Sequence, residues 1–281
     1  MDYKTWRQQA EQQMQWKGYE ATSVKWLIMD TLQWSSAQAV MHEMDSIPEK
    51  TMRLLDERLL QLLSGRPVQY VVGQAAFYGR QFKVTPDVLI PRPETEEVVQ
   101  YFLSKMKQPG TVADIGVGSG AIAVTLKAEN EALEVIATDI SAEALEVARD
   151  NARAHQQHIT FYEGDALQPL INNAIRLDGL ISNPPYIGVN EREWMDAHVI
   201  AHEPHVALFA DNEGFQVYES ILRDLPKVMR EGAPVVFEIG FQQGKALTTL
   251  MASWYPHIAT EVLEDINGNA RMFYFNWTSS S

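Results

Sequence analysis

The first indication of the fold is the run Thr111-Val112-Ala113-Asp114-Ile115-Gly116-Val117-Gly118-Ser119-Gly120. Its first half, 111–115, has the apolar pattern of a short buried strand, and residues 121–128 have the composition of a helix. Glycines at such a strand-to-helix turn let a ligand approach the backbone closely, and the first N–H groups of the helix face that ligand. The run predicts a nucleotide-like cofactor, with candidate contacts from Asp114, Gly116, Val117, Gly118, Ser119 and Gly120.

Two further strand ends carry acidic side chains. Residues 133–139 have the pattern of a strand that ends in Asp139, a placement suited to holding the hydroxyls of a ribose. Residues 159–163 form a third strand, and the turn after it, with Asp165 and Ala166, could accept a hydrogen bond from an adenine amino group. Because the carboxyl ends of parallel strands meet at one edge of a sheet, we expect these residues to share a crevice with the glycine turn.

The glycine turn by itself fits a second class of cofactor. Gly116 and Gly118 together with Ala121 also satisfy the dinucleotide pattern that has alanine in its third position. A nicotinamide or flavin enzyme is therefore an alternative at this point, although the acidic turn at 164–166 weakens it.

A fourth apolar run, 177–182, leads into Asn183-Pro184-Pro185-Tyr186. The ring of Pro184 restricts Asn183 to an extended conformation, so the Asn183 side-chain oxygen and the Pro184 carbonyl can point at one place. Two such acceptors match the two N–H donors of a planar NH2 group, and an aromatic ring can lie against its face. The motif predicts catalytic roles for Asn183, Pro184 and Tyr186 and a substrate contact for Pro185, with Asn183 also bordering the cofactor.

These motifs together resemble the class I S-adenosylmethionine-dependent methyltransferases that act on amino groups. The block Val88-Leu89-Ile90-Pro91-Arg92-Pro93-Glu94-Thr95-Glu96 is more specific, since it resembles the HemK/PrmC family of protein-(glutamine-N5) methyltransferases. Matching segments extend over nearly the whole chain, including Gly65 to Tyr70, Glu203-Pro204, Phe237 to Gly240 and Asp265 to Arg271. The loop 211–214 departs from the glycine-richer loop of that family.

The resemblance implies a fold, a cofactor and a protein substrate. The implied fold is α/β, a Rossmann-like mixed seven-stranded sheet with a small N-terminal helical bundle and a connecting β-hairpin. S-Adenosylmethionine is the implied cofactor. The implied reaction methylates the side-chain amide of the glutamine in the Gly-Gly-Gln motif of peptide chain release factors, and so modulates translation termination.

Alternative functions remain for a chain with this NH2-binding motif. A ribosomal-protein glutamine methyltransferase is disfavoured by the block at 91–94. A DNA adenine N6-methyltransferase is disfavoured by charge, because residues 1–66 carry a net charge of −1 and the rest of the chain −13 of the total −14. Duplex DNA binding normally needs a basic face. A noncatalytic adaptor that binds translation factors through residues 1–64 is a third alternative.

The predicted organisation has three parts. Residues 1–66 form a helical domain, with helices expected at 2–17, 20–33, 36–44 and 48–64, that the resemblance assigns to release-factor recognition. Residues 67–92 form the hairpin connector, and 93–281 form the methyltransferase domain. Its later strands are expected at 233–239, 257–263 and 272–277, the last two supplying an antiparallel hairpin. The tryptophans at 6, 16, 26 and 34 could form a binding face, but packing in the core of the bundle is the favoured expectation.

Composition excludes several kinds of protein. The chain has no cysteine, so disulfides, thiolate catalysis and cysteine zinc sites are ruled out. His198, His202 and His205 are not expected to bind a metal, because Pro204 interrupts their helical spacing. Residues 1–7 are polar and no stretch approaches the ~18 apolar residues of a membrane span, so a cytoplasmic protein without membrane association is expected.

Overall fold

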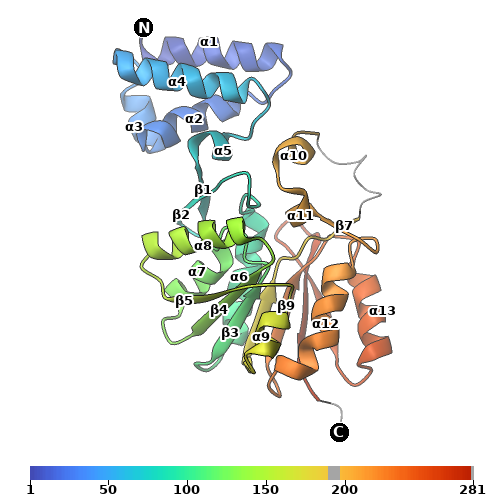
Figure 1. Ribbon diagram of the computed structural model, residues 1–281. Coiled ribbons are helices and arrows are strands. Elements are labelled where there is room, and N and C mark those ends of the chain that lie inside the picture. Colours follow the sequence, from blue (N-terminus) through green and yellow to red (C-terminus); the bar gives the residue numbers. More distant parts are fainter. Residues whose placement is uncertain (189–196, 280–281) are drawn as a thin grey trace. The chain divides into compact units, whose positions relative to one another are not determined.

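The computed structural model describes residues 1–188 and 197–279, and internal contacts divide the chain into two compact units (Figure 1). The first unit comprises Met1–Ala75, Val84–Pro86 and Asp196–His202, and the second comprises Ala76–Lys83, Asp87–Met195 and Glu203–Ser281. By this division, residues 67–75 belong to the same unit as the N-terminal helices.

The first unit is a helical bundle whose main helices lie where the sequence predicts them: α1 (Tyr3–Trp16), α2 (Thr22–Leu32), α3 (Ser36–Met41) and α4 (Glu49–Leu62). Side chains cap the N-termini of two of these helices. Asp2 accepts a hydrogen bond from the Thr5 N–H at the start of α1, and Ser35 forms a capping box with Gln38 at the start of α3. The apolar stripes of α1, α2 and α4 meet in one core.

The tryptophans of this bundle divide into buried and exposed ones. Trp6 is buried and its ring N–H donates to Asp56 at 2.8 Å, and Trp34 is partly buried against Tyr3. Trp16 is 92% exposed and Trp26 is 51% exposed, so the expectation of core packing is wrong for these two. The reason is helical spacing, because each lies outside the stripe of buried residues on its own helix.

The expected hairpin between the domains is shorter than residues 67–92. Its first part is a short helix, α5 (Val68–Val72), which follows Pro67 and ends at Gly73 in the left-handed conformation. Burial of two α5 side chains overrides the strand preference of its valines. The hairpin itself consists of β1 (Gln74–Phe77) and β2 (Arg80–Lys83), joined by a two-residue turn with both φ angles positive.

The second unit contains a mixed seven-stranded sheet, as predicted, in the order β10-β11-β9-β6-β3-β4-β5. Figure 1 labels four of these strands, β3, β4, β5 and β9. The strands are β3 (Thr111–Ile115), β4 (Glu134–Asp139), β5 (Ile159–Glu163), β6 (Gly179–Ser182), β9 (Pro234–Glu238), β10 (Thr260–Glu264) and β11 (Ala270–Asn276). Strand β11 is antiparallel to both β9 and β10, which confirms the antiparallel hairpin, and the remaining pairs are parallel.

Helices cover both faces of this sheet. One face carries α6 (Pro93–Lys105), α7 (Ala121–Glu129) and α8 (Ala142–Ala154), and the other carries α9 (Gln168–Asn172), α12 (Gln216–Val228) and α13 (Gly244–Trp254). Neighbouring strand residues alternate between the two cores, so that Val112 packs with α6 and α7 whereas Ala113 packs with α12. Both faces of the strands are thereby apolar, as in other parallel sheets.

The remaining elements are short: α10 (Ala197–His202), α11 (His205–Leu208), and the strands β7 (Ile187–Gly188) and β8 (Phe209–Ala210), which pair in parallel. Within the described residues, no helix has the length and apolar character needed to cross a membrane.

Candidate active site

A cavity of about 670 Å³ lies at the carboxyl edge of the sheet, where the strand order reverses. Strands β4 and β5 follow β3 on one side, whereas β6 returns to its other side, so Ile115 pairs with Thr138 and with Ser182. Such a switch point is where open α/β sheets bind ligands. The cavity has the size of a small-molecule site.

The predicted glycine turn forms one wall of the cavity, which residues 116–119 line. The backbone N–H groups of Gly116 and Val117 both donate to the Thr138 carbonyl at 2.9 Å, and this holds the turn against β4. Gly116 has a φ of +77°, and no atom lies within 4 Å of the position that a Cβ would take there. The turn therefore leaves open space that a ligand can fill.

Gly120 ends the same turn but does not line the cavity. A Cβ at this position would lie 3.1 Å from Ala148 Cα in helix α8, and the φ of Gly120 is +82°. The structure therefore places Gly120 at a close contact between α7 and α8, where a larger side chain would be crowded.

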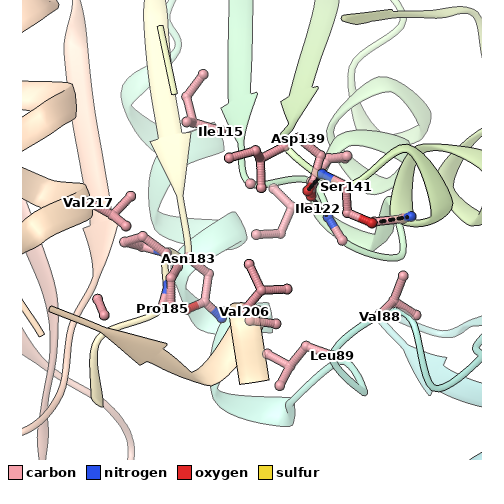
Figure 2. Close-up of a pocket in the computed structure, with 18 of the residues that line it drawn as sticks. Val88, Leu89, Ile115, Ile122, Asp139, Ser141, Asn183, Pro185, Val206 and Val217 are labelled. Atoms are coloured by element: carbon pink, nitrogen blue, oxygen red, sulfur yellow. Dashed lines mark hydrogen bonds between the residues drawn. The ribbon is translucent and has the colours of Figure 1, made fainter. Parts of the chain in front are cut away.

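Asp139 lies at the end of β4 and lines the cavity. Its carboxylate accepts hydrogen bonds from the N–H groups of Gly118 and Ser141, both at 2.9 Å, so it ties the glycine turn to the start of α8. The pKa of Asp139 is raised above its ordinary value, because the effect of burial exceeds the lowering effect of these N–H groups. In Figure 2, Asp139 and Ser141 lie on one side of the cavity, and Asn183 and Pro185 lie on the other.

Asp114, a predicted cofactor contact, lies beneath the cavity and does not line it. Its side chain is fully buried, one oxygen accepts from the Ala123 N–H at 3.1 Å, and the other has no hydrogen-bond partner among the described residues. Burial raises the pKa of Asp114 to about 8. Because it holds the first turn of α7, Asp114 supports the glycine turn from behind.

Asp165 and Ala166 both line the cavity, as predicted, in the turn after β5. The Ala166 carbonyl accepts from the Thr138 hydroxyl at 3.0 Å, which joins this turn to β4. Ile140 also lines the cavity and is 61% exposed, although the sequence analysis assigned it no role. An exposed isoleucine beside two acidic groups is suited to one face of an aromatic base.

Asn183, Pro184 and Pro185 line the cavity, whereas Tyr186 does not. The Tyr186 carbonyl accepts from the Gln243 side chain at 2.7 Å. Burial, together with the nearby charge of Glu238, raises the pKa of Tyr186 to about 12. The phenol therefore keeps its proton at neutral pH and is no general base there.

Two residues behind Asn183 were missed by the sequence analysis as site residues. The Asn183 side-chain N–H donates to the Thr95 hydroxyl at 3.3 Å, and that hydroxyl donates to Glu238 at 2.6 Å. Burial raises the pKa of Glu238 to about 7, against the lowering effects of Thr95 and Arg271. The available signals were the specific block around Thr95 and the position of Glu238 at the end of a strand.

Arg92 is a further cavity residue without a predicted role. Its guanidinium forms an ion pair at 2.5 Å with Glu203, whose side chain is buried and also accepts from the Ile90 N–H at 3.4 Å. A buried carboxylate thus fixes one positive charge at the cavity edge.

These features fit the cofactor that the resemblance implies. The empty positions beside Gly116 and Gly118 form a cradle for a polar chain, Asp139 offers a carboxylate to a ribose, and Ile140 offers an apolar surface to adenine. Within residues 1–188 and 197–279, no group of three His, Cys, Asp or Glu side chains is arranged to hold a metal. The side chain of His198 lies outside the described residues.

Comparisons with known families and proteins agree over most of the chain. The family described as PrmC N-terminal domain matches residues 5–73, and the methyltransferase small domain matches residues 94–224. The chain is 49% identical over 277 residues to the release factor glutamine methyltransferase of Staphylococcus aureus, covering 99% of this chain and 100% of that protein. The protein of the same name from Enterococcus faecalis is 42% identical over 259 residues, covering 91% and 92%.

Solved structures with much lower identity share the fold. A methyltransferase from Pyrococcus furiosus has a TM-score of 0.54 at 14% identity and covers 79% of this chain and 98% of that one. The catalytic domain of hMettl16 also has a TM-score of 0.54, at 13% identity, and covers 80% and 82%. The methyltransferase fold predicted from the sequence is confirmed.

Proposed function

The chain belongs to the release factor glutamine methyltransferase family, and from this premise we propose that it methylates the side-chain amide nitrogen, N5, of a glutamine in a peptide chain release factor. The target is the glutamine of the Gly-Gly-Gln motif, and the methyl donor is S-adenosylmethionine. One observation carries the proposal: Asn183 and Pro184 line the same cavity as the glycine turn and Asp139. Donor and acceptor groups can therefore meet in one cavity.

The residues on the two sides of the cavity would bind different ligands: the donor wall, on the side of the glycine turn, would bind the cofactor, and the acceptor wall, on the side of Asn183, would bind the substrate amide. Gly116 to Ser119, Asp139, Asp165 and Ala166 would hold the donor, and Asp114 supports them from beneath. When bound, S-adenosylmethionine supplies a methyl group on a positively charged sulfur, a transfer that requires no metal. The protein must then bring the acceptor nitrogen into line with that methyl group.

The acceptor is a poor nucleophile, because the nitrogen lone pair of an amide is delocalised into the carbonyl. Asn183 Oδ1 and the Pro184 carbonyl would accept the two N–H groups, which aligns the nitrogen and stabilises the positive charge that develops on it. The role predicted for Tyr186, limiting the plane of the amide, would require its ring to reach the acceptor site, because Tyr186 does not line the cavity in this structure. A pKa of about 12 leaves Tyr186 neutral, so we assign the proton lost after transfer to solvent.

The test is mass spectrometry of a purified release factor after incubation with the enzyme and S-adenosylmethionine. We expect one methyl group on the Gly-Gly-Gln glutamine, and none when that glutamine is replaced by alanine. Ribosomal proteins and duplex DNA, incubated with a labelled methyl donor, serve as competing substrates. Labelling of either one, with no labelling of the release factor, would refute the proposal.

We further infer that residues 1–66 help to recognise the release factor. Trp16 and Trp26 support this inference, because two exposed tryptophans on one small bundle are suited to a protein contact. Trp16→Ala should raise the KM for the whole release factor and leave the Kd of the cofactor unchanged. An unchanged KM in the Trp16→Ala, Trp26→Ala double variant would remove the inference. A cytoplasmic location is proposed with it, since release factors act on ribosomes.

A further inference from the structure

A chain of hydrogen bonds runs from the cavity into the core behind Asn183. Asn183 Nδ2 lies 3.3 Å from Thr95 Oγ1, and Thr95 Oγ1 lies 2.6 Å from Glu238 Oε2. Thr95 is only 4% exposed and Glu238 only 1% exposed, so water competes little for these bonds. The three residues come from helix α6, from the end of β6 and from the end of β9.

The direction of these bonds determines which end of the Asn183 amide faces the cavity. A hydroxyl has one proton, and an ionised carboxylate can only accept. The Thr95 proton is therefore committed to Glu238, and Thr95 Oγ1 can only accept from Asn183. This arrangement turns the NH2 group of Asn183 toward Thr95 and leaves its oxygen for a ligand.

We propose that Glu238 and Thr95 are positioning residues that set the orientation of the Asn183 amide, so that its oxygen, and not its NH2 group, meets the NH2 group of the substrate glutamine. The inference rests on the proposed function, since it concerns the same acceptor site. With the amide reversed, two NH2 groups would face each other and the acceptor would lose a hydrogen bond.

The state of Glu238 controls this arrangement. A protonated Glu238 can donate to Thr95 Oγ1, which frees the Thr95 proton to bond Asn183 Oδ1 in the reversed amide. The charged groups Glu94, Arg92 and Arg271 and the Tyr186 phenol act on Glu238, and the Tyr218 hydroxyl donates to the Glu238 carbonyl. Burial is the largest influence and raises the pKa of Glu238 to about 7 against the lowering effects of Thr95, Arg271 and Arg92, so the ionised fraction of Glu238 falls as the pH drops through neutrality.

Paired substitutions at Thr95 test the proposal. Thr95→Val keeps the shape but removes the hydroxyl, and we expect kcat on the release factor to fall about tenfold or more, the loss of one well-placed hydrogen bond. The cofactor Kd should change little, and Thr95→Ser should restore most of the turnover. Thr125→Val is the matched control, because Thr125 is equally buried in α7 but does not line the cavity. Its kcat should equal that of the wild type.

The pH profile separates positioning from general packing. Wild-type kcat should rise with pH through an inflection near neutrality, and Glu238→Gln should lower kcat and remove that inflection. Wild-type turnover in Thr95→Val, or failure of Thr95→Ser to restore it, would overturn the proposal. An unaltered inflection in Glu238→Gln would also overturn it. A wild-type enzyme that does not methylate the release factor would instead refute the proposed function, so the two failures are distinguishable.

Discussion

The two walls of the cavity are built by different means. The donor wall is mostly backbone, since Gly116 to Ser119 are consecutive residues held by N–H bonds to Thr138 and Asp139. The acceptor wall depends on side chains from distant segments, because Thr95 meets Asn183 across 88 positions and Glu238 across 143. A local turn positions the donor wall, whereas the acceptor wall exists only when the whole sheet has formed. Substitutions in the two walls should therefore have separable effects.

Asn183→Ala is expected to give the largest difference between the effect on turnover and the effect on cofactor affinity. This change removes an acceptor that acts on developing charge, a loss that typically costs ~10² to 10³ in rate. Turnover should fall by that factor, whereas the cofactor Kd measured by calorimetry should stay close to wild type. Asn172→Ala, at an exposed position outside the cavity lining, is the control and should change neither quantity. Full activity in Asn183→Ala would mean that the acceptor wall is not where we place it.

Asp139→Ala should produce the opposite pattern. Its carboxylate accepts from Gly118 and Ser141 and is placed to hold the ribose, so its loss removes hydrogen bonds to a charged group, worth ~1.5–3 kcal/mol. We expect cofactor affinity to fall roughly 10- to 100-fold, and kcat at saturating cofactor to fall much less. Asp139→Asn keeps one acceptor oxygen, so its cofactor affinity should lie between those of the wild type and Asp139→Ala. A Kd that is unchanged in both variants would contradict the ribose assignment.

The contrast between the walls also explains how much the sequence could predict. The glycine turn, Asp139, the 165–166 turn and the seven strands were predictable, because each depends on residues that are close together in the chain. The pairing of Thr95 with Glu238 was not, since no local pattern says which of many polar residues will meet in a core. Tyr186 shows the same limit, because it belongs to the motif but lies outside the cavity lining.

Substitutions of two glycines in the same turn should differ in their effects on cofactor affinity and on the free energy of unfolding. Gly116→Ala and Gly120→Ala both place an alanine at positive φ, but only the latter adds a contact, 3.1 Å from Ala148 Cα. Positive φ at a residue other than glycine costs roughly 1 kcal/mol or more, so Gly120→Ala should lower the free energy of unfolding by about 1–2 kcal/mol. Gly116→Ala should lower it less and weaken cofactor binding more. Urea unfolding and calorimetry measure the two effects, and equal losses of stability would contradict the crowding expected at Gly120.

The smallest effect on turnover is expected from a substitution in the turn that joins β10 to β11, at residues 265–269. Asp265 accepts from the N–H groups of Asn267 and Asn269 and from Arg271, whose charge acts on Glu238. The Asn269 N–H lowers the pKa of Asp265 most, and Arg271 also lowers it. A lowered pKa means that the ionised group stabilises the fold above its unfolded value of 3.8, and that this contribution disappears as the pH falls through the folded value.

Asp265→Asn should therefore reduce the free energy of unfolding at pH 7, with a deficit that shrinks below pH 4, and should leave turnover close to wild type. Unfolding by urea across this pH range measures the deficit. Glu264→Gln removes the same charge from the neighbouring exposed residue and should have little effect at any pH. A deficit that stayed constant as the pH fell from 7 to well below 3.8 would show that Asp265 acts through packing and not through its charge. The acceptor wall would then depend on the shape of this turn, as the donor wall depends on its glycines.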